Sequence, residues 1–358
     1  MKIITIIGFG RSGMDLLQSL FDGHEQVSQF PGYVNFASFY KKINNSNNAS
    51  FIADTFIHNY KGFFNSKFNK IENHHKLGAK KNESYRISKV LFKRYLKKIL
   101  SEYSKKNILA KLHLAYSMAN GEDINKKKII LINVHNINNY TFYKDIDFEI
   151  FCTIRNPFNS LGSAINNWLN YKNGKYVSPW FLYFHIDRIF NLLDELQSLK
   201  KKIYVIKLDL LHTKNIVVMK NLCKNIGIKF SKILLKSTYH NKQWWGDELS
   251  AKPLNGINNK FTDKIKCNLF FKKDVYILEY FLKDFFLNYK YKLIKKKCPL
   301  VILLSILPMK IELKIWFKTI RIMRIFDIVS IPYYWIKRIK LMFSYKICKK
   351  KYPPFVNL

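Results

Sequence analysis

The stretch Ile3-Ile4-Thr5-Ile6-Ile7-Gly8-Phe9-Gly10-Arg11-Ser12-Gly13 decides the fold class, and it leads directly into the apolar-periodic segment Met14 to Phe21. The apolar run predicts a strand that is buried on both faces, and the spacing after it predicts a helix. Glycines allow a tight turn with open backbone N–H groups, and the positive end of the next helix faces the same place. The sequence therefore predicts a strand-turn-helix unit that binds an anion.

Two common nucleotide-binding patterns fit this turn only in part. The glycines have the spacing of a dinucleotide-binding fingerprint and of half a P-loop. A P-loop needs Lys and then Ser or Thr after its last glycine, where this chain has Met14 and Asp15. A dinucleotide site needs an acidic residue at the end of the next strand, and the segment 27–32 ends without one. A P-loop kinase is therefore only a distant alternative, and nicotinamide binding is disfavoured.

A second unit of the same kind follows the mostly apolar run Phe148 to Ile154. Pro157 suits the first turn of a helix, and Arg155 stands just ahead of it, so a guanidinium group and free helix N–H groups should converge on one point. Ser163 follows two turns along that helix. Alone, this pattern would also fit an ordinary strand-helix junction with a surface Arg.

The two units together resemble the sulfotransferases that use 3′-phosphoadenosine 5′-phosphosulfate (PAPS). In that family a turn reading Lys or Arg, Ser, Gly, Thr, Thr holds the 5′-phosphosulfate. A later Arg at a strand end and a Ser eight residues on hold the 3′-phosphate. Arg11-Ser12-Gly13 matches the first signature, and Arg155 with Ser163 matches the second. The resemblance covers about residues 1–260 in the order of elements, but Met14 and Asp15 replace both Thr residues of the family turn.

The resemblance implies a set of nucleotide-binding residues. They are Gly10, Arg11, Ser12, Gly13, Met14, Asp15, Arg155, Ser163, Trp244 and Trp245. The two tryptophans resemble a Trp-Gly loop of bacterial members and would stack on adenine, although burial in the core would explain them as well. The Asp15 carboxylate either positions a neighbour or an acceptor group, or it marks a degraded nucleotide site.

Two catalytic roles also follow from the resemblance. Arg11 would stabilise the charge of a loose sulfuryl-transfer transition state. His135 follows the predicted strand Ile129 to Val134 and would take the proton of the acceptor hydroxyl, unless it is a structural histidine. His113, in Lys111-Leu112-His113-Leu114, is a rival base whose place in the chain fits less well.

The implied reaction moves a sulfuryl group from PAPS to a hydroxyl, which we expect on a cell-surface carbohydrate or a glycolipid precursor. An insertion such as Ser46 to Tyr85 would contact the acceptor and determine which acceptor binds. No metal cofactor is expected. A non-catalytic or divergent phosphate-binding scaffold at a membrane stays open, because Met14 and Asp15 depart from the family.

The amino-acid composition indicates which classes of binding partner and which cellular location to expect. The 358 residues include 62 Lys and Arg against 24 acidic residues, a formal net charge of +38. Nucleic acid and anionic membranes attract such a chain, but no nucleic-acid-binding module is present, so specific nucleic-acid binding is not expected. The abundance of Lys, Asn, Ile, Phe and Tyr also fits a compositional bias. Five unpaired-looking cysteines and an N-terminal core strand predict a reducing, cytoplasmic location.

The sequence predicts a catalytic domain at 1–297 and a different segment at 298–358. Residues 299–309 are almost wholly apolar but too short to cross a bilayer, which takes about 20 residues. Residues 311–350 interleave large apolar residues with Lys and Arg. This pattern predicts amphipathic helices that lie on the anionic inner face of a membrane, or helices that pack on the catalytic core.

The predicted fold is α/β, with three layers and a mainly parallel central sheet. We expect its strands near Ile3 to Ile7, Ile129 to Val134, Glu149 to Ile154 and Ile203 to Lys207, with helices on both faces.

Overall fold

The computed structural model describes most of the chain. The described residues are 1–44, 46–101, 103–134, 143, 145–169, 180–248, 256–257, 269–293, 300–320 and 323–347. His135 lies outside them, so its predicted role is a matter of sequence alone.

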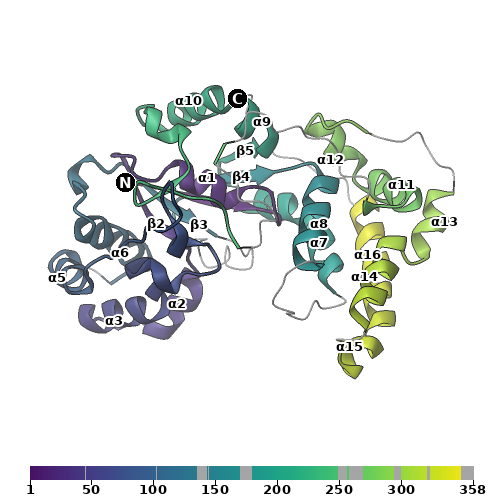
Figure 1. Cartoon of the computed structure of the whole chain (residues 1–358), viewed down its shortest axis with the longest axis horizontal. Coiled ribbons are helices and arrows are strands. Elements are labelled where there is room, and N and C mark those ends of the chain that lie inside the picture. Colours follow the sequence, from purple (N-terminus) through teal and green to yellow (C-terminus); the bar gives the residue numbers. More distant parts are fainter. Residues whose placement is uncertain are drawn as a thin grey trace.

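The centre of the molecule is a parallel five-stranded sheet with the order β2-β3-β1-β4-β5 (Figure 1). β1 (Lys2–Gly8) lies between β3 (Ile129–Asn133) and β4 (Glu149–Ile154). β2 (Val27–Tyr33) pairs with β3, and β5 (Ile203–Lys207) pairs with β4. The α/β fold with a parallel sheet is confirmed, and so are the four predicted strands.

β2 is a fifth strand beyond those four. It contains Pro31, which has no N–H to donate, and proline is tolerated in strands at the edge of a sheet. β2 occupies such an edge, and its register with β3 shifts between Gln29 and Tyr33.

One face of the sheet is covered by α1 (Met14–Leu20), α9 (Leu208–Thr213) and α10 (Asn215–Ile226). Their apolar side chains form one buried cluster with alternate strand residues, among them Ile4 and Ile6. Successive side chains of a strand point to opposite faces, so Ile3 and Ile7 of the same strand point to the opposite face of the sheet.

The opposite face is covered by α6 (Lys105–Ala119), α7 (Pro157–Leu169) and α8 (Phe181–Ser198). Ile3 and Ile7 belong to the larger buried cluster on this side. Helices on both faces explain why the strand runs are apolar throughout rather than alternating. The three-layer arrangement predicted from the sequence is therefore confirmed.

A helical lobe follows β2 and lies at one end of the long axis (Figure 1). Its elements are α2 (Phe36–Ile43), α3 (Ala49–Asn59), α4 (Lys61–Phe64), η1 (Ser66–Phe68), η2 (His74–Lys76) and α5 (Lys89–Ile99). Further short elements are η3 (Ile124–Lys126), η5 (Lys232–Leu235) and the hairpin strands β6 (Thr238–Tyr239) and β7 (Lys242–Gln243). In the helical lobe, aromatic rings pack against one another and against β2, among them Phe30, Phe56 and Phe63.

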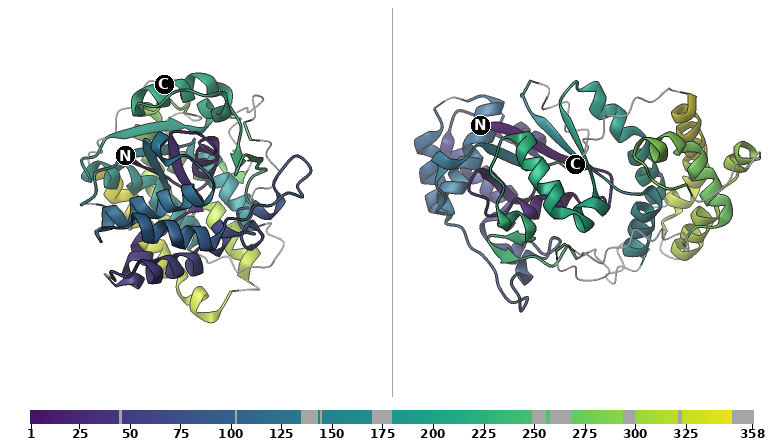
Figure 2. Two further views of the ribbon diagram at one scale, coloured as in Figure 1. Left: turned by 90° about the vertical axis from the view of Figure 1, so that its left-hand side faces the viewer. Right: turned by 90° about the horizontal axis from the view of Figure 1, so that it is seen from above.

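The C-terminal helices form a second lobe at the other end, beyond α8 (Figures 1 and 2). They are α11 (Lys272–Phe281), α12 (Lys283–Asn288), α13 (Val301–Ile306), α14 (Lys310–Thr319), α15 (Ile325–Val329) and α16 (Ile331–Ile347). α16 packs on α8 and on α11, which precedes the predicted domain boundary. The boundary at 297 itself falls outside the described residues and stays a prediction. Within the part of the chain that the structure describes, no helix combines the length and apolar composition of a membrane span.

Candidate functional site

The turn after β1 has an unusual backbone. Arg11 has a φ of 64° and Gly13 a φ of 95°, and both lie in the left-handed region. That region is uncommon for a residue with a side chain, and such strain gathers at functional sites. The Ser12 N–H donates to the Phe9 carbonyl at 3.2 Å, and α1 begins directly after Gly13. The turn thus has the form of the backbone concavities that bind anions.

Gly8 is required where β1 meets the turn and β4. The Ser12 hydroxyl lies 2.8 Å from the Thr153 hydroxyl, across the backbone of Gly8. A Cβ atom on Gly8 would lie 2.3 Å from Ser12 Oγ and 2.6 Å from the Thr153 carbonyl oxygen. The backbone oxygen cannot move aside as a flexible side chain could, so only glycine fits.

The two predicted anion-binding units meet. Arg155 Nη1 donates to the Arg11 carbonyl at 3.3 Å, so the guanidinium group lies directly against the first turn. The Ser160 hydroxyl, one turn into α7, donates to the Gly10 carbonyl. Ser163 is half-buried one turn further along α7. Its contact with a 3′-phosphate stays a prediction.

α8 supplies two residues to this place that the sequence analysis missed. Arg188 Nε donates to the Gly8 carbonyl at 3.1 Å. A Cβ atom on Gly10 would lie 2.6 Å from His185 Cε1 and 2.8 Å from its Nδ1, so the imidazole packs against the turn. The spacing of three residues in a helix places both side chains on one face. No local motif marks them, because α8 is far from the turn in the sequence.

Burial, chiefly, and the positive charges of Arg188 and Arg11 together lower the pKa of the His185 imidazole to about 4. The ring is therefore expected to be neutral at pH 7. His212, in α9, has its pKa lowered to about 4 by burial and by Arg155. The positive charge around the turn is therefore carried by the arginines.

A loop after β7 closes on the turn. Arg11 Nη1 forms an ion pair with Asp247 Oδ2 at 2.7 Å, with both side chains mostly buried. Trp244 Nε1 donates to the Glu72 carbonyl, and Trp245 Nε1 donates to the Gly78 carbonyl. Both indole N–H groups are thus engaged by the helical lobe. Stacking of the tryptophans on adenine stays a prediction, whereas Asp247 is a site residue that the sequence analysis did not identify.

We expect Asp247→Asn to strengthen the binding of an anionic nucleotide by roughly fivefold, since a carboxylate beside Arg11 offsets its charge by about 1 kcal/mol at a partly solvated site. Titration calorimetry with 3′,5′-bisphosphoadenosine measures this effect. Glu83→Gln, at the more exposed Lys242–Glu83 ion pair, is the matched control and should leave the affinity unchanged. Weaker binding by Asp247→Asn would mean that the carboxylate orients Arg11 for the anion instead.

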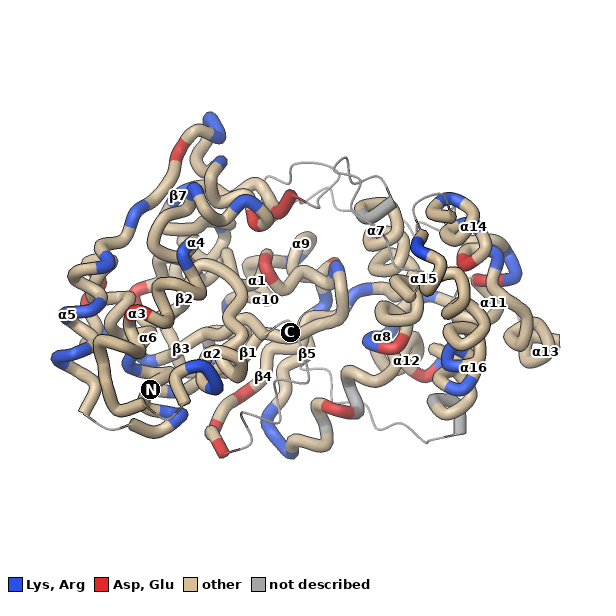
Figure 3. The backbone as a smooth tube through the Cα atoms, turned by 90° about the horizontal axis from the view of Figure 1, so that it is seen from below, with Lys and Arg blue, Asp and Glu red and all other residues tan. Residues whose placement is uncertain are grey.

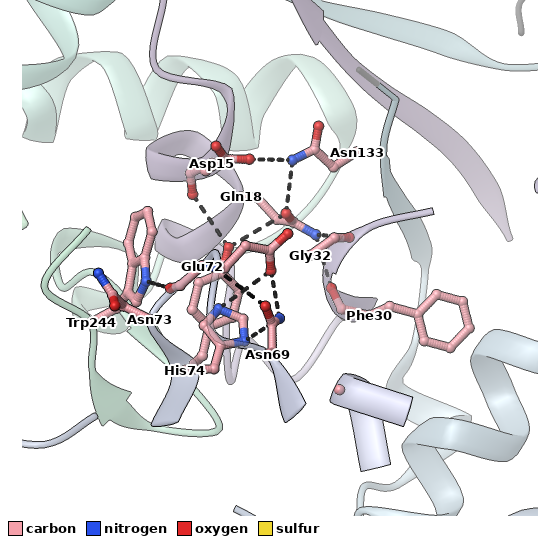
Figure 4. Close-up of polar contacts among 12 residues, drawn as sticks. Asp15, Gln18, Phe30, Gly32, Asn69, Glu72, Asn73, His74, Asn133 and Trp244 are labelled. Atoms are coloured by element: carbon pink, nitrogen blue, oxygen red, sulfur yellow. Dashed lines mark hydrogen bonds and ion pairs between the residues drawn. The ribbon is translucent and has the colours of Figure 1, made fainter. Parts of the chain in front are cut away.

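Met14 and Asp15 face different surroundings. Met14 is 8% exposed and belongs to the buried cluster beneath α1. Asp15 Oδ1 accepts a hydrogen bond from Asn133 Nδ2 at 2.8 Å, and the same amide group donates to Gln18 Oε1 at 3.0 Å (Figure 4). Asp15 thus links the first turn of α1 to the end of β3, as a residue that positions a neighbour would.

A second carboxylate, that of Glu72 in the helical lobe, lies near this network (Figure 4). Glu72 Oε2 accepts a hydrogen bond from Asn69 Nδ2 at 2.8 Å. The same oxygen packs against Gly32, because a Cβ atom added to Gly32 would lie only 2.3 Å from it. His74 lies beside it with a pKa lowered to about 3 by burial, chiefly, and by the nearby His240. Glu72 belongs to the insertion 46–85 that the sequence analysis assigned to acceptor recognition.

The rival histidine lies in the core. His113 is fully buried in α6, and its ring centroid is 3.9 Å from that of Phe30. Burial lowers its pKa to about 3. These surroundings favour a structural role for His113.

Comparisons with known proteins find little similarity in sequence. No protein-family model and no curated protein matches the chain. The chain is similar to the solved structure of a sulfotransferase domain from the curacin biosynthetic pathway, with 13% sequence identity and a TM-score of 0.45. The match covers 74% of this chain and 89% of that one. A sulfotransferase domain from the Synechococcus PCC 7002 olefin synthase is 11% identical, with a TM-score of 0.41, over 66% and 77% of the two chains.

Proposed function

We propose that this protein is a sulfotransferase that takes its sulfuryl group from PAPS and transfers it to a hydroxyl group of an acceptor. The observation that carries the proposal is the hydrogen bond from Arg155 to the Arg11 carbonyl, because it joins the two units that the sequence assigns to the two ends of one nucleotide. A guanidinium group beside an anion-binding turn suits a nucleotide with phosphate at both its 3′ and 5′ positions.

The residues at the turn suit the donor. Three arginines, Arg11, Arg155 and Arg188, gather at the carboxyl ends of β1 and β4, where ligands of parallel α/β sheets bind. Sulfuryl transfer is expected to resemble phosphoryl transfer, in which positioned positive charge provides most of the stabilisation. Arg11 would supply that charge at the transferred group, and it cannot act as the acid because it stays protonated.

The acceptor side of the proposal rests on carboxylates. Asp15 and Glu72 come from different segments and lie near each other in Figure 4, and each carboxylate can accept hydrogen bonds from hydroxyl groups. A carbohydrate or a glycolipid precursor offers several hydroxyl groups and suits such a surface. His135, two residues beyond the end of β3, is the proposed base.

A non-catalytic phosphate-binding scaffold is the second candidate. It is favoured by the ion pair between Arg11 and Asp247, which partly neutralises the residue that would stabilise the transition state. Incubation with radiolabelled PAPS and a membrane glycolipid fraction separates the two functions. An enzyme transfers label to the lipid fraction, whereas a scaffold binds the nucleotide without transfer.

Arg155→Ala is expected to weaken the binding of 3′,5′-bisphosphoadenosine by about 1.5 to 3 kcal/mol, because it removes a charge-assisted hydrogen-bonding group. Calorimetry measures the loss, and Arg94→Ala, at an exposed position of α5, should show none. Arg155→Lys keeps the charge without the planar fork and should lie between the two.

The ligand itself provides the decisive comparison. Adenosine 5′-phosphosulfate, which has no 3′-phosphate, should bind weakly to the unmodified protein and should be insensitive to Arg155→Ala. Equal affinity for the two nucleotides would exclude a 3′-phosphate site at Arg155 and with it the proposed donor.

A further inference from the structure

The hairpin formed by α14, α15 and α16 ends in an apolar surface. Phe326 is 86% exposed, Ile325 78%, Phe317 72% and Val329 70%. We define the apolar tip as these residues together with Ile320, Ile328, Tyr333 and Ile336, all of which are exposed. Isolated exposed apolar residues are normal, but a group of them on neighbouring helices marks an interaction surface.

The members of the apolar tip are neighbours through the chain. Phe317 and Ile320 stand at the end of α14, α15 follows, and Tyr333 and Ile336 stand at the start of α16. Figure 1 shows α15 at the end of the C-terminal lobe, away from the central sheet. The other side of the same helices is buried, as Ile315 and Tyr334 illustrate. The exposed apolar residues are therefore what remains after the lobe has packed.

The helices that carry the apolar tip have a net positive charge. The sequence from 300 to 347 has nine Lys and Arg and two acidic residues. Glu312 is buried and paired with Arg338 at 3.2 Å, and Asp327 accepts a hydrogen bond from the backbone N–H of Arg324. Both carboxylates thus serve the fold of the lobe. Figure 3 shows Lys and Arg positions along α14 and α16.

We propose that the apolar tip inserts into the interfacial region of a membrane that carries anionic lipid. Apolar side chains would enter the boundary between headgroups and acyl chains, while Lys314, Arg324, Lys337 and Lys340, which are all exposed, would contact the lipid headgroups. Apolar burial and charge attraction act together at such a surface. A second copy of this chain fits less well, because it would bring two positively charged rims together.

The proposal places the candidate site near the membrane. Trp180 Nε1 donates to Ser330 Oγ, just beyond α15, and its ring packs against Tyr333. His185 lies five residues further along, which is about 8 Å of helix rise. A lipid-linked acceptor could therefore reach the turn, but the membrane proposal stands independently of the sulfotransferase proposal.

Co-sedimentation of the full chain with vesicles tests the membrane proposal. Binding to vesicles of phosphatidylcholine with about one third phosphatidylserine should exceed binding to pure phosphatidylcholine by at least roughly tenfold. Phe326→Ser with Val329→Ser should lower the partition coefficient by about 10- to 100-fold, since two apolar side chains no longer leave water. Phe68→Ser with Val90→Ser is the matched control, because both residues are exposed at the far lobe. It should bind like the unmodified protein.

A charge variant completes the test. Arg324→Gln with Lys337→Gln should lower binding to anionic vesicles by about tenfold or more, while Arg94→Gln with Lys98→Gln, on α5, should have a smaller effect. Equal binding to both vesicle types, equal losses in the tip variant and its matched control, or no binding to either vesicle would overturn the proposal. Concentration-dependent dimerisation that Phe326→Ser and Val329→Ser abolish, without vesicle binding, would instead assign the apolar tip to a second copy.

Discussion

Replacing His135 by Ala is expected to lower sulfuryl turnover by about 10² to 10⁴ while leaving the affinity for 3′,5′-bisphosphoadenosine nearly unchanged, as removal of a general base does. The expectation rests on the end of β3. The Val134 N–H donates to the Ile6 carbonyl, so the chain leaves the sheet beside β1 at the edge where the Gly8 turn begins. His135 follows Val134 directly in the sequence, and its assignment as the base rests on that place in the chain. Single-turnover kinetics with radiolabelled PAPS measures the effect.

Two other histidines make this prediction specific. His185→Asn removes the ring that packs against Gly10, and it should change donor affinity more than turnover. His58→Ala, at an exposed position of α3, should change neither quantity. A larger loss of turnover in His185→Asn than in His135→Ala would transfer the role of base to α8.

Glu312→Ala is expected to lower the free energy of unfolding by about 3 to 5 kcal/mol, because it leaves the buried Arg338 guanidinium without its carboxylate. Arg338 and Glu312 are 0% and 1% exposed, and Arg338 Nε lies 3.2 Å from Glu312 Oε1. The Tyr334 hydroxyl donates to the same oxygen at 2.6 Å, and the Met309 N–H donates to Glu312 Oε2 at 2.7 Å. The substitution therefore removes the ion-pair partner of Arg338 and leaves two donors, the Tyr334 hydroxyl and the Met309 N–H, without their acceptor.

Urea unfolding, followed by circular dichroism, measures this loss. Glu83→Ala is the control, because its ion pair with Lys242 is largely exposed and should contribute no more than about 1 kcal/mol. The double variant Glu312→Ala, Arg338→Ala should lose less than the sum of the two single variants, since neither charge then stays buried alone. A loss within about 0.5 kcal/mol for Glu312→Ala would show that the C-terminal lobe opens without affecting the rest of the fold.

Local chemistry made much of the fold predictable. The strand runs, the turn after Gly8 and the start of α7 at Pro157 depend on residues that are adjacent in the sequence. α10 ends at Ile226, and the next residue, Gly227, has a φ of 79°, in the left-handed region that commonly ends a helix. Periodicity and turn residues act over a few positions, so a single sequence is enough to read them.

The partners at the site come from distant segments. Asp247 is 236 residues from Arg11, and Arg188 is 180 residues from Gly8. Arg188 belongs to no local motif, and Asp247 follows the Trp-Gly segment without a pattern that assigns it a partner, because an ion pair or a contact with a backbone carbonyl has no periodicity in the sequence. His113 shows the converse case, since a sequence that resembles a catalytic motif lies in the core against Phe30.

The sequence by itself determined the α/β class, the two strand-turn-helix units and the basic, amphipathic character of the C-terminal segment, since each depends on neighbouring residues. Only the tertiary structure decided which side chains join the turn and which face of the C-terminal helices is buried. Tyr334 and Arg338 lie inside, whereas Phe326 and Val329 remain exposed. All four belong to one amphipathic pattern, and burial distinguishes them because it depends on packing between elements far apart in the chain.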